Sequence, residues 1–217
     1  SEQTLESYKK EVLSLEQELI KVAEELHKKR VKGAPVLSDS VNSELEDLNM
    51  KGVTFHVSVE KSQELGPVGF SDVEFLSQTS PKDPARPLSK FASGGELSRI
   101  LLSLKRVVGS QRYPRTYLFD EVDTGVSGPT AEKVGKKLRS IAKGQQVICV
   151  THLPQVAAFG DAHFLIQKTQ KKDRVNMEVL DLSFDERVDE IARLISGEKL
   201  TKTSKAHAAE LLKACDV

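Results

Sequence analysis

The most regular pattern of apolar and polar positions lies in residues 1–32. Apolar side chains recur there at alternating intervals of three and four residues, at Leu5, Tyr8, Val12, Leu15, Leu19, Val22 and Leu26. Glu, Lys, Gln and Ser fill most of the positions between them. This is the spacing of a coiled-coil seam, held over about three heptads. The alternative is a helix packed on the domain's own core, which would show a wider apolar face. The pattern therefore predicts a coiled-coil arm at residues 1–32.

A break in the helical pattern follows, and then an alternating pattern begins. Gly33 and Pro35 interrupt the helix, so we expect a linker with one short helix at residues 33–49. Apolar and polar residues alternate at 53–59 and again at 72–76, with a Gly-Pro-Val-Gly turn between them. This predicts an antiparallel pair of strands. We place the main domain at residues 50–217.

A turn of small residues opens the next helix. Ser93, Gly94 and Gly95 precede apolar positions at helical spacing, which end at Gly109. A helix start of this kind presents unpaired N–H groups and a hydroxyl, and its glycines let a phosphate approach the backbone. The alternative is a plain capping box, with Ser93 as the N-cap and Glu96 three residues later. The turn by itself does not decide between these interpretations.

Two carboxylates follow the next strand. Residues 116–119 are apolar on both faces, which is typical of a central parallel strand, and Asp120 and Glu121 come directly after it. A helix from Pro129 and an apolar strand at 147–150 complete a β-α-β unit, and His152 follows the second strand. The carboxyl ends of parallel strands meet at one edge of a sheet, so these three side chains are expected together. A sheet edge of this kind suits phosphate and a divalent cation.

Charge and composition exclude several classes of protein. The 32 basic and 32 acidic residues cancel, so no global field points to nucleic acid or to a membrane surface. A row of lysines on the helix after Pro129 is interpreted as a solvated face, with a nucleic-acid contact as the alternative; its members are Lys133, Lys136, Lys137 and Lys143. Two cysteines form no disulfide framework, which suits a reducing cytoplasm. No run is apolar enough to span a membrane, and the start in mid-pattern without Met indicates part of a longer chain.

Four motifs in this order resemble the ATPase heads of SMC-like ABC proteins. Residues 93–96 resemble the ABC signature turn, 118–121 a Walker B strand with its glutamate, 124–127 the D-loop, and His152 the switch histidine. The flanking strings at 87–92, 119–128 and 149–158 are similar to the RecN family of bacterial DNA repair proteins, and the similarity covers about residues 50–215. The resemblance implies an α/β fold: the C-terminal lobe of a P-loop ABC/SMC-type head, with a coiled-coil helix before it.

Two positions depart from the pattern of the ABC family. Ser127 stands where many D-loops carry Asp, which puts any transfer of that aspartate's chemistry in doubt. No G-x-x-x-x-G-K-S/T string occurs, so the P-loop that cradles the phosphates is missing. The resemblance places that loop in an N-terminal lobe beyond the coiled coil. This chain is then the C-terminal half of a split head, and we expect it to be inactive alone.

The resemblance also implies roles for individual residues, with ATP and Mg²⁺ as cofactors. Glu121 and His152 would be catalytic, and Asp120 would hold the metal. Residues that would bind nucleotide, in part on a second head in an ATP-sandwich dimer, are Ser93, Gly94, Gly95, Glu96, Asp123 and Thr124.

The implied partners are the Walker A lobe, a second head and DNA, in the bacterial cytoplasm at the nucleoid, without a membrane. Alternatives are a non-catalytic association module of a coiled-coil protein, or the head lobe of another SMC-like ATPase.

Overall fold

The computed structural model describes residues 2–90, 93–109, 113–171 and 174–216. The chain divides into two compact units, one of residues 1–46 and 50–92 and the other of residues 47–49 and 93–217. Phe91 and Ala92, which belong to the family-like string before the signature turn, lie outside the described residues.

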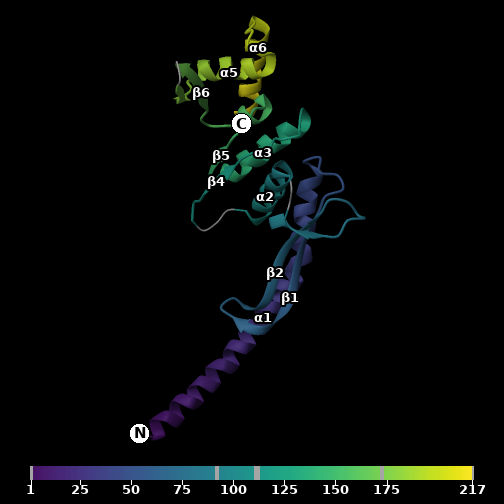
Figure 1. The fold of residues 1–217 in the computed structure, drawn as a ribbon, viewed down its shortest axis with the longest axis vertical. Helices are drawn as coiled ribbons and strands as arrows, with labels where there is room; N and C mark the ends of the chain where they lie inside the picture. The colour runs from purple at the N-terminus through teal and green to yellow at the C-terminus, as the bar shows by residue number, and fades with distance from the viewer. Residues whose placement is uncertain (1, 91–92, 110–112, 172–173, 217) are drawn as a thin grey trace. The chain divides into compact units, whose positions relative to one another are not determined.

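The first unit is a long helix with a small antiparallel sheet on its C-terminal half. Helix α1 spans Glu2–Glu46, and the sheet holds β1 (Thr54–Gly66), β2 (Gly69–Gln78) and the short β3 (Arg86–Pro87), followed by the 3₁₀ turn η1 (Leu88–Lys90). The hairpin β1–β2 runs alongside α1 (Figure 1). The predicted antiparallel pair is therefore confirmed, in a register that pairs Phe55 with Ser77.

Side chains of α1 provide partners for the backbone of the β1 edge. Asn42 donates to the Phe55 carbonyl at 3.0 Å and accepts from the Phe55 N–H at 2.7 Å. Ser38 accepts from the Val57 N–H at 3.0 Å. An uncovered edge would leave these backbone groups to water or to another chain. The helix therefore closes this part of the sheet, and Phe55, Val41 and Leu45 are fully buried beneath it.

The predicted helix break at residues 32–35 is wrong. Helix α1 continues through Pro35 and includes most of the short helix expected at 41–48. Proline within a helix costs about 3 kcal/mol, but Pro35 lies on the exposed side, where water can bind the carbonyl that loses its N–H partner. Ala34, Val41 and Leu45 are buried on the other side. Burial of the two larger side chains contributes about 1.5–3 kcal/mol each, which outweighs the proline.

The long N-terminal helix itself is confirmed. In the described part of the chain, its predicted seam residues from Leu5 to Val22 are all more than half exposed. Burial on α1 begins at Ala23, where the hairpin starts to cover it. A coiled-coil partner for residues 1–22 stays a prediction.

The second unit contains the predicted β-α-β crossover. Helix α2 (Gly94–Val108) leads to β4 (Thr116–Phe119), and α3 (Pro129–Ala142) connects it to the parallel strand β5 (Gln146–Cys149). Ile100, Leu102, Phe119 and Val134 are buried where the two helices cover one face of this sheet. On the other face, the described residues leave Leu118 68% and Ile148 48% exposed. The described residues therefore cover one face of the predicted parallel pair and leave the other face exposed.

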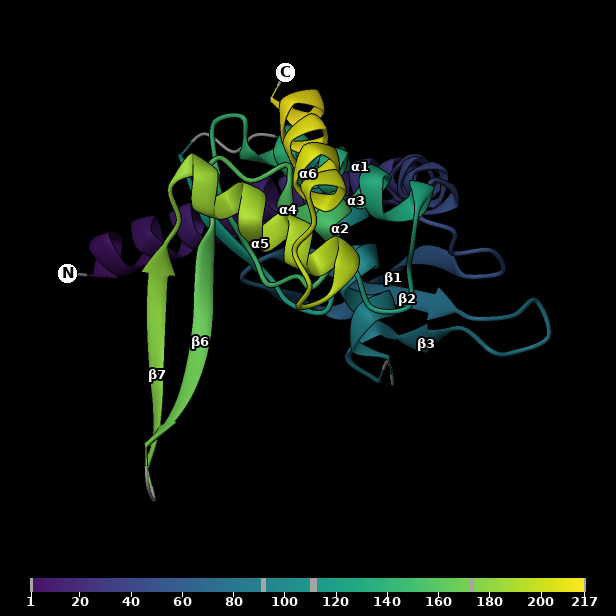
Figure 2. The same cartoon turned by 90° about the horizontal axis from the view of Figure 1, so that it is seen from above.

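The rest of the second unit packs around a small helical core. It consists of α4 (Pro154–Ala157), the hairpin β6 (Phe164–Lys171) and β7 (Arg174–Asp181), α5 (Phe184–Ser196) and α6 (Lys202–Cys215). Ala158, Ile191, Ala208 and Leu212 form the centre of this core. The hairpin projects from it (Figure 2). Ser183 and Glu186 form the expected capping box at the start of α5.

The lysine row on α3 is only partly solvated. Lys137 is buried and binds Asp47 at 3.1 Å, and Lys133 reaches the same carboxylate at 3.4 Å. Lys137 thereby holds the pKa of Asp47 below its usual value. Lys136 pairs with Glu132 one turn earlier at 2.6 Å. Asp47 and Glu132 therefore neutralise three lysines of the row. Lys143, just after the helix, has no such ion pair among the described residues.

Candidate active site

The carboxyl ends of β4 and β5 bring the predicted site residues together. The strands stay paired to their last residues, and the Val150 N–H donates to the Phe119 carbonyl at 2.9 Å. Asp120 and Glu121 therefore leave the sheet beside Thr151 and His152. The expected co-location of the two carboxylates and the histidine loop follows from this parallel pairing.

The backbone at Glu121 adopts an unusual conformation. Its φ is +57°, in the left-handed region that non-glycine residues rarely occupy. The preceding Asp120 side chain accepts from the Glu121 N–H at 2.9 Å, and the Asp120 carbonyl accepts from the Ser98 hydroxyl at 2.7 Å. Such conformations cost about 1–3 kcal/mol and persist where surrounding contacts impose them. One of these two bonds comes from Ser98 of α2, so a direct contact joins the first turns of this helix to the end of β4.

The small-residue turn contacts the acidic edge of its own chain. Ser93 is the N-cap of α2, and its hydroxyl accepts from the Glu96 N–H at 3.4 Å. A Cβ on Gly94 would overlap Oε2 of Glu121, and one on Gly95 would lie 3.0 Å from Cβ of Thr124. Ser93 therefore acts as the N-cap of α2. Gly95 is closely packed, because a Cβ there would also lie 3.1 Å from the Glu121 carbonyl oxygen, whereas at Gly94 the overlap is with the end of the Glu121 side chain, which can move.

Arg99 fixes the loop after β4, and the sequence reasoning missed it. This guanidinium is 7% exposed and donates to the carbonyls of Thr124 at 2.7 Å and Val122 at 3.4 Å. Burial lowers the pKa of Arg99, against the opposing charges of Glu96 and Asp123, but an arginine still keeps its charge at neutral pH. The sequence does contain a signal for Arg99. Gly95, Arg99 and Ser103 recur every four residues and so lie on one side of α2, which the structure shows to be buried.

Asp123 joins the loops that follow the two strands. Its carboxylate is 2% exposed, accepts from the Thr151 hydroxyl and the His152 N–H at 3.2 Å, and lies 3.5 Å from Nδ1 of His152. The His152 side chain is 71% exposed. The buried carboxylate therefore holds the backbone of the histidine loop, while the imidazole projects outward from the edge.

The electrostatic environment of this edge is negative. Burial, together with the nearby charges of Asp123 and Asp120, raises the pKa of the Cys149 thiol to about 12. Cys149 therefore stays protonated at neutral pH, which excludes it as a thiolate nucleophile. A negative edge of this kind attracts a cation.

The donor set at this edge fits Mg²⁺ held in part by a ligand. Asp120 is exposed, and its carboxylate accepts from the Glu121 N–H, its only hydrogen bond within the described ranges. Within the described residues, no group of three or more His, Cys, Asp and Glu side chains could hold a metal ion by itself. Mg²⁺ commonly binds through one or two carboxylates, substrate phosphates and water. A single carboxylate beside a phosphate site meets that requirement.

Across the described ranges, no helix combines the length and the apolar character needed to cross a membrane.

Comparison with curated proteins finds closely similar sequences. The chain is 44% identical over 180 residues to the DNA repair protein RecN of Halalkalibacterium halodurans, which covers 81% of this chain and 32% of that protein. It is 39% identical over 213 residues to RecN of Vibrio cholerae, covering 98% of this chain and 38% of that protein. The chain thus spans about a third of the length of these relatives, 32% of one and 38% of the other. No family model matches it.

The fold is also found among solved structures. The Smc head domain of Pyrococcus yayanosii, solved with a coiled coil and joint, superimposes with a TM-score of 0.58 at 18% identity. The superposition covers 91% of this chain and 35% of that one. At this identity, the likeness establishes the SMC-type head fold.

Proposed function

The sequence belongs to the RecN family over the part of those proteins that it spans, and from that premise we propose that this chain is the C-terminal lobe of an ATPase head in DNA double-strand break repair. The observation that carries the proposal is the edge where Asp120, Glu121 and His152 lie beside the signature-like turn. The P-loop would come from another part of the protein. ATP would join two heads, and hydrolysis would release them.

Each side chain at the edge has a role in this mechanism. Phosphoryl transfer to water needs a positioned nucleophile and neutralised charge on the transferring group. Glu121 would orient and polarise the attacking water, and His152 would donate from its exposed imidazole to the γ-phosphate. Asp120 would hold Mg²⁺, which neutralises phosphate charge when bound. Glu121 is exposed, and the Ser98 and Asp120 hydrogen bonds fix the backbone from which its carboxylate extends.

The signature-like turn would act on nucleotide bound to the opposite head. The first N–H groups of α2 and the Ser93 hydroxyl suit a γ-phosphate, because helix N-termini carry partial positive charge. Gly94 and Gly95 pack directly on Glu121 and Thr124 of the same chain. A phosphate that binds the turn would therefore contact an element that also holds the catalytic glutamate. Glu96 and Thr124 lie on this surface as well.

Asp123 is better suited to positioning than to direct nucleotide binding. Its carboxylate is buried and already accepts bonds from Thr151 and His152. We assign it the task of orienting the loop that presents His152.

The first test is ATP hydrolysis by this chain alone and mixed with the P-loop-bearing part of the same protein. We expect turnover only in the mixture. Glu121→Gln should lower kcat by at least about a hundredfold, the scale of a lost catalytic acid–base group, and leave ATP-dependent head association intact. Asp185→Asn, an exposed carboxylate in the first turn of α5, is the matched control. Parent-like turnover of Glu121→Gln would contradict the assignment of the base.

A non-catalytic association module is the second candidate. The observation in its favour is the exposed seam of α1, which indicates pairing with another helix whatever the head does. The same mixture decides between them, because an association module would bind the P-loop part without turnover.

A further inference from the structure

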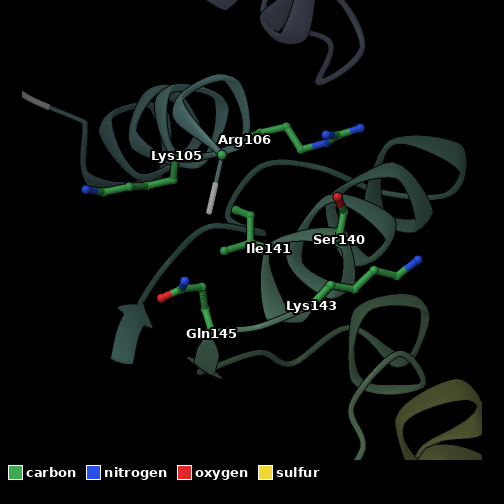
Figure 3. Close-up of a pocket in the computed structure, with 7 residues that line it drawn as sticks. Lys105, Arg106, Ser140, Ile141, Lys143 and Gln145 are labelled. Carbon is green, nitrogen blue, oxygen red and sulfur yellow. The ribbon is translucent and has the colours of Figure 1, made fainter. Parts of the chain in front are cut away.

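The end of the β4–β5 sheet opposite the acidic edge carries a basic pocket. Helices α2 and α3 both end there, and the two strands begin there. The pocket is a cavity of about 130 Å³ lined by three cations, Lys105, Arg106 and Lys143, and among the described residues no acidic side chain lines it. Figure 3 shows Arg106 and Lys143 extending to the same side, with the Ser140 hydroxyl between them.

The cations of this pocket are not neutralised within the described residues. The Lys105 ammonium lies 5.0 Å from the centre of the Tyr117 ring, a cation–π contact that leaves its charge in place. Arg106 and Lys143 are exposed and form no ion pair in that part of the chain, in contrast to the other three lysines of the α3 row. The sequence adds no acid nearby, because neither 97–119 nor 133–160 contains Asp or Glu.

The helix dipoles do not cancel this charge. Each helix C-terminus carries the equivalent of about half a negative charge, so two of them contribute about −1. Lys105 extends to the opposite side from Arg106 and Lys143 (Figure 3), so these two cations leave their side of the pocket with a net charge of about +1. The Ser140 hydroxyl adds a hydrogen-bond donor that an anion can use, and the cavity has room for a phosphate group.

We propose that this pocket binds a phosphate of the DNA backbone, with Arg106 and Lys143 as its charged partners and Ser140 as a donor. The proposal rests on the proposed DNA-repair function and adds a site for its partner. Phosphate contacts from Arg, Lys and Ser dominate sequence-independent binding to DNA. Strand β4 separates the pocket from the acidic edge by four residues, about 13 Å. DNA at the pocket would therefore stay clear of the nucleotide.

The test measures binding of a labelled DNA duplex to the complete protein, without nucleotide, at several salt concentrations. Arg106→Gln/Lys143→Gln should weaken binding about tenfold at low salt and reduce the slope of log K against log[salt] by about 1.8, because each lost phosphate contact removes about 0.9. Lys199→Gln/Lys202→Gln removes the same charge from exposed positions outside the pocket and should change neither value. Thermal unfolding checks that both variants fold.

Three results would overturn the proposal. They are a parent-like salt slope in the pocket variant, an equal loss in the control variant, or no DNA binding by the parent protein. Inorganic phosphate is tested in parallel. If the pocket variant loses phosphate binding but keeps DNA binding, the ligand is free phosphate and the DNA site lies elsewhere. ATP hydrolysis is measured separately, so failure of the ATPase proposal leaves this result interpretable.

Discussion

At the scale of single residues, the site is held by buried polar groups that make specific bonds. Asp123 links the loops that follow β4 and β5, and Arg99 of α2 holds the loop after β4. Both side chains are almost fully buried. A buried charge without partners is very costly, so each constrains the backbone that provides its partners. The exposed groups, Asp120, Glu121 and His152, are thereby left to face a ligand from a rigid frame.

The role of Asp123 can be tested by Asp123→Asn. The Thr151 hydroxyl and the His152 N–H both donate to the same oxygen, Oδ2 of Asp123. An amide oxygen in that place keeps both bonds but weakens them, because the negative charge is lost. We expect a loss of about 1–3 kcal/mol in the free energy of unfolding. In the reconstituted ATPase, kcat should fall while KM for ATP changes little, because the histidine loop is displaced and not removed.

The matched control is Asp161→Asn, which breaks an exposed pair with Arg139 and should cost under about 1 kcal/mol. If Asp123→Asn destabilises the protein but leaves kcat unchanged, Asp123 has only a structural role.

At the scale of elements, helix α1 illustrates how packing overrides local breakers. Gly33 and Pro35 predict an end to the helix, and the structure continues it because the hairpin covers the opposite face. Rules based on local sequence account for the free-energy cost of Gly33 and Pro35 within a helix. They do not account for the free energy gained when Val41 and Leu45 are buried, because that burial depends on strands that begin at Thr54.

Pro35→Ala therefore has a definite expected effect. It restores a backbone N–H in a helix that is already formed, so the free energy of unfolding should rise by about 1–3 kcal/mol. Urea unfolding measures the change. Val36→Ala, at the next exposed position, should stay within about 0.5 kcal/mol of the parent. Destabilisation by Pro35→Ala would mean that the helix does not pass through this residue as described.

At the scale of the whole molecule, the exposed face of the β4–β5 sheet indicates a missing layer. Leu118, Ile148 and Val150 are 68%, 48% and 52% exposed, on strands whose other face is packed by helices. Parallel sheets are normally covered on both faces. Since the chain spans about a third of its RecN relatives, we expect the P-loop-bearing part of the protein to supply this cover.

Leu118→Lys tests that expectation. A charge on this face should weaken association with the P-loop-bearing part by at least about tenfold, because a buried, unpaired ammonium is strongly unfavourable. It should barely change the stability of the chain alone, where the position faces water. Val68→Lys, equally exposed on the β1–β2 turn, is the control. Analytical ultracentrifugation of the mixture measures association, and unchanged binding by Leu118→Lys would exclude this face as the contact.

The sequence by itself determined the features that depend on local pattern. Periodicity predicted the long helix from Leu5, alternation predicted the hairpin, and the order of strand, helix and strand predicted the shared edge of Asp120 and His152. These features follow from the pitch of a helix, the pleat of a strand and the handedness of a crossover, which hold at short range along the chain.

Only the tertiary structure decided how distant residues share space. The continuation of α1 through Pro35, the contact of Gly94 with Glu121 and the burial of Asp123 against Thr151 all depend on elements far apart in sequence. The same holds for the basic pocket, whose cations come from the ends of two helices. Packing and desolvation set these arrangements, and their free energies depend on distances in space that a one-dimensional pattern does not contain.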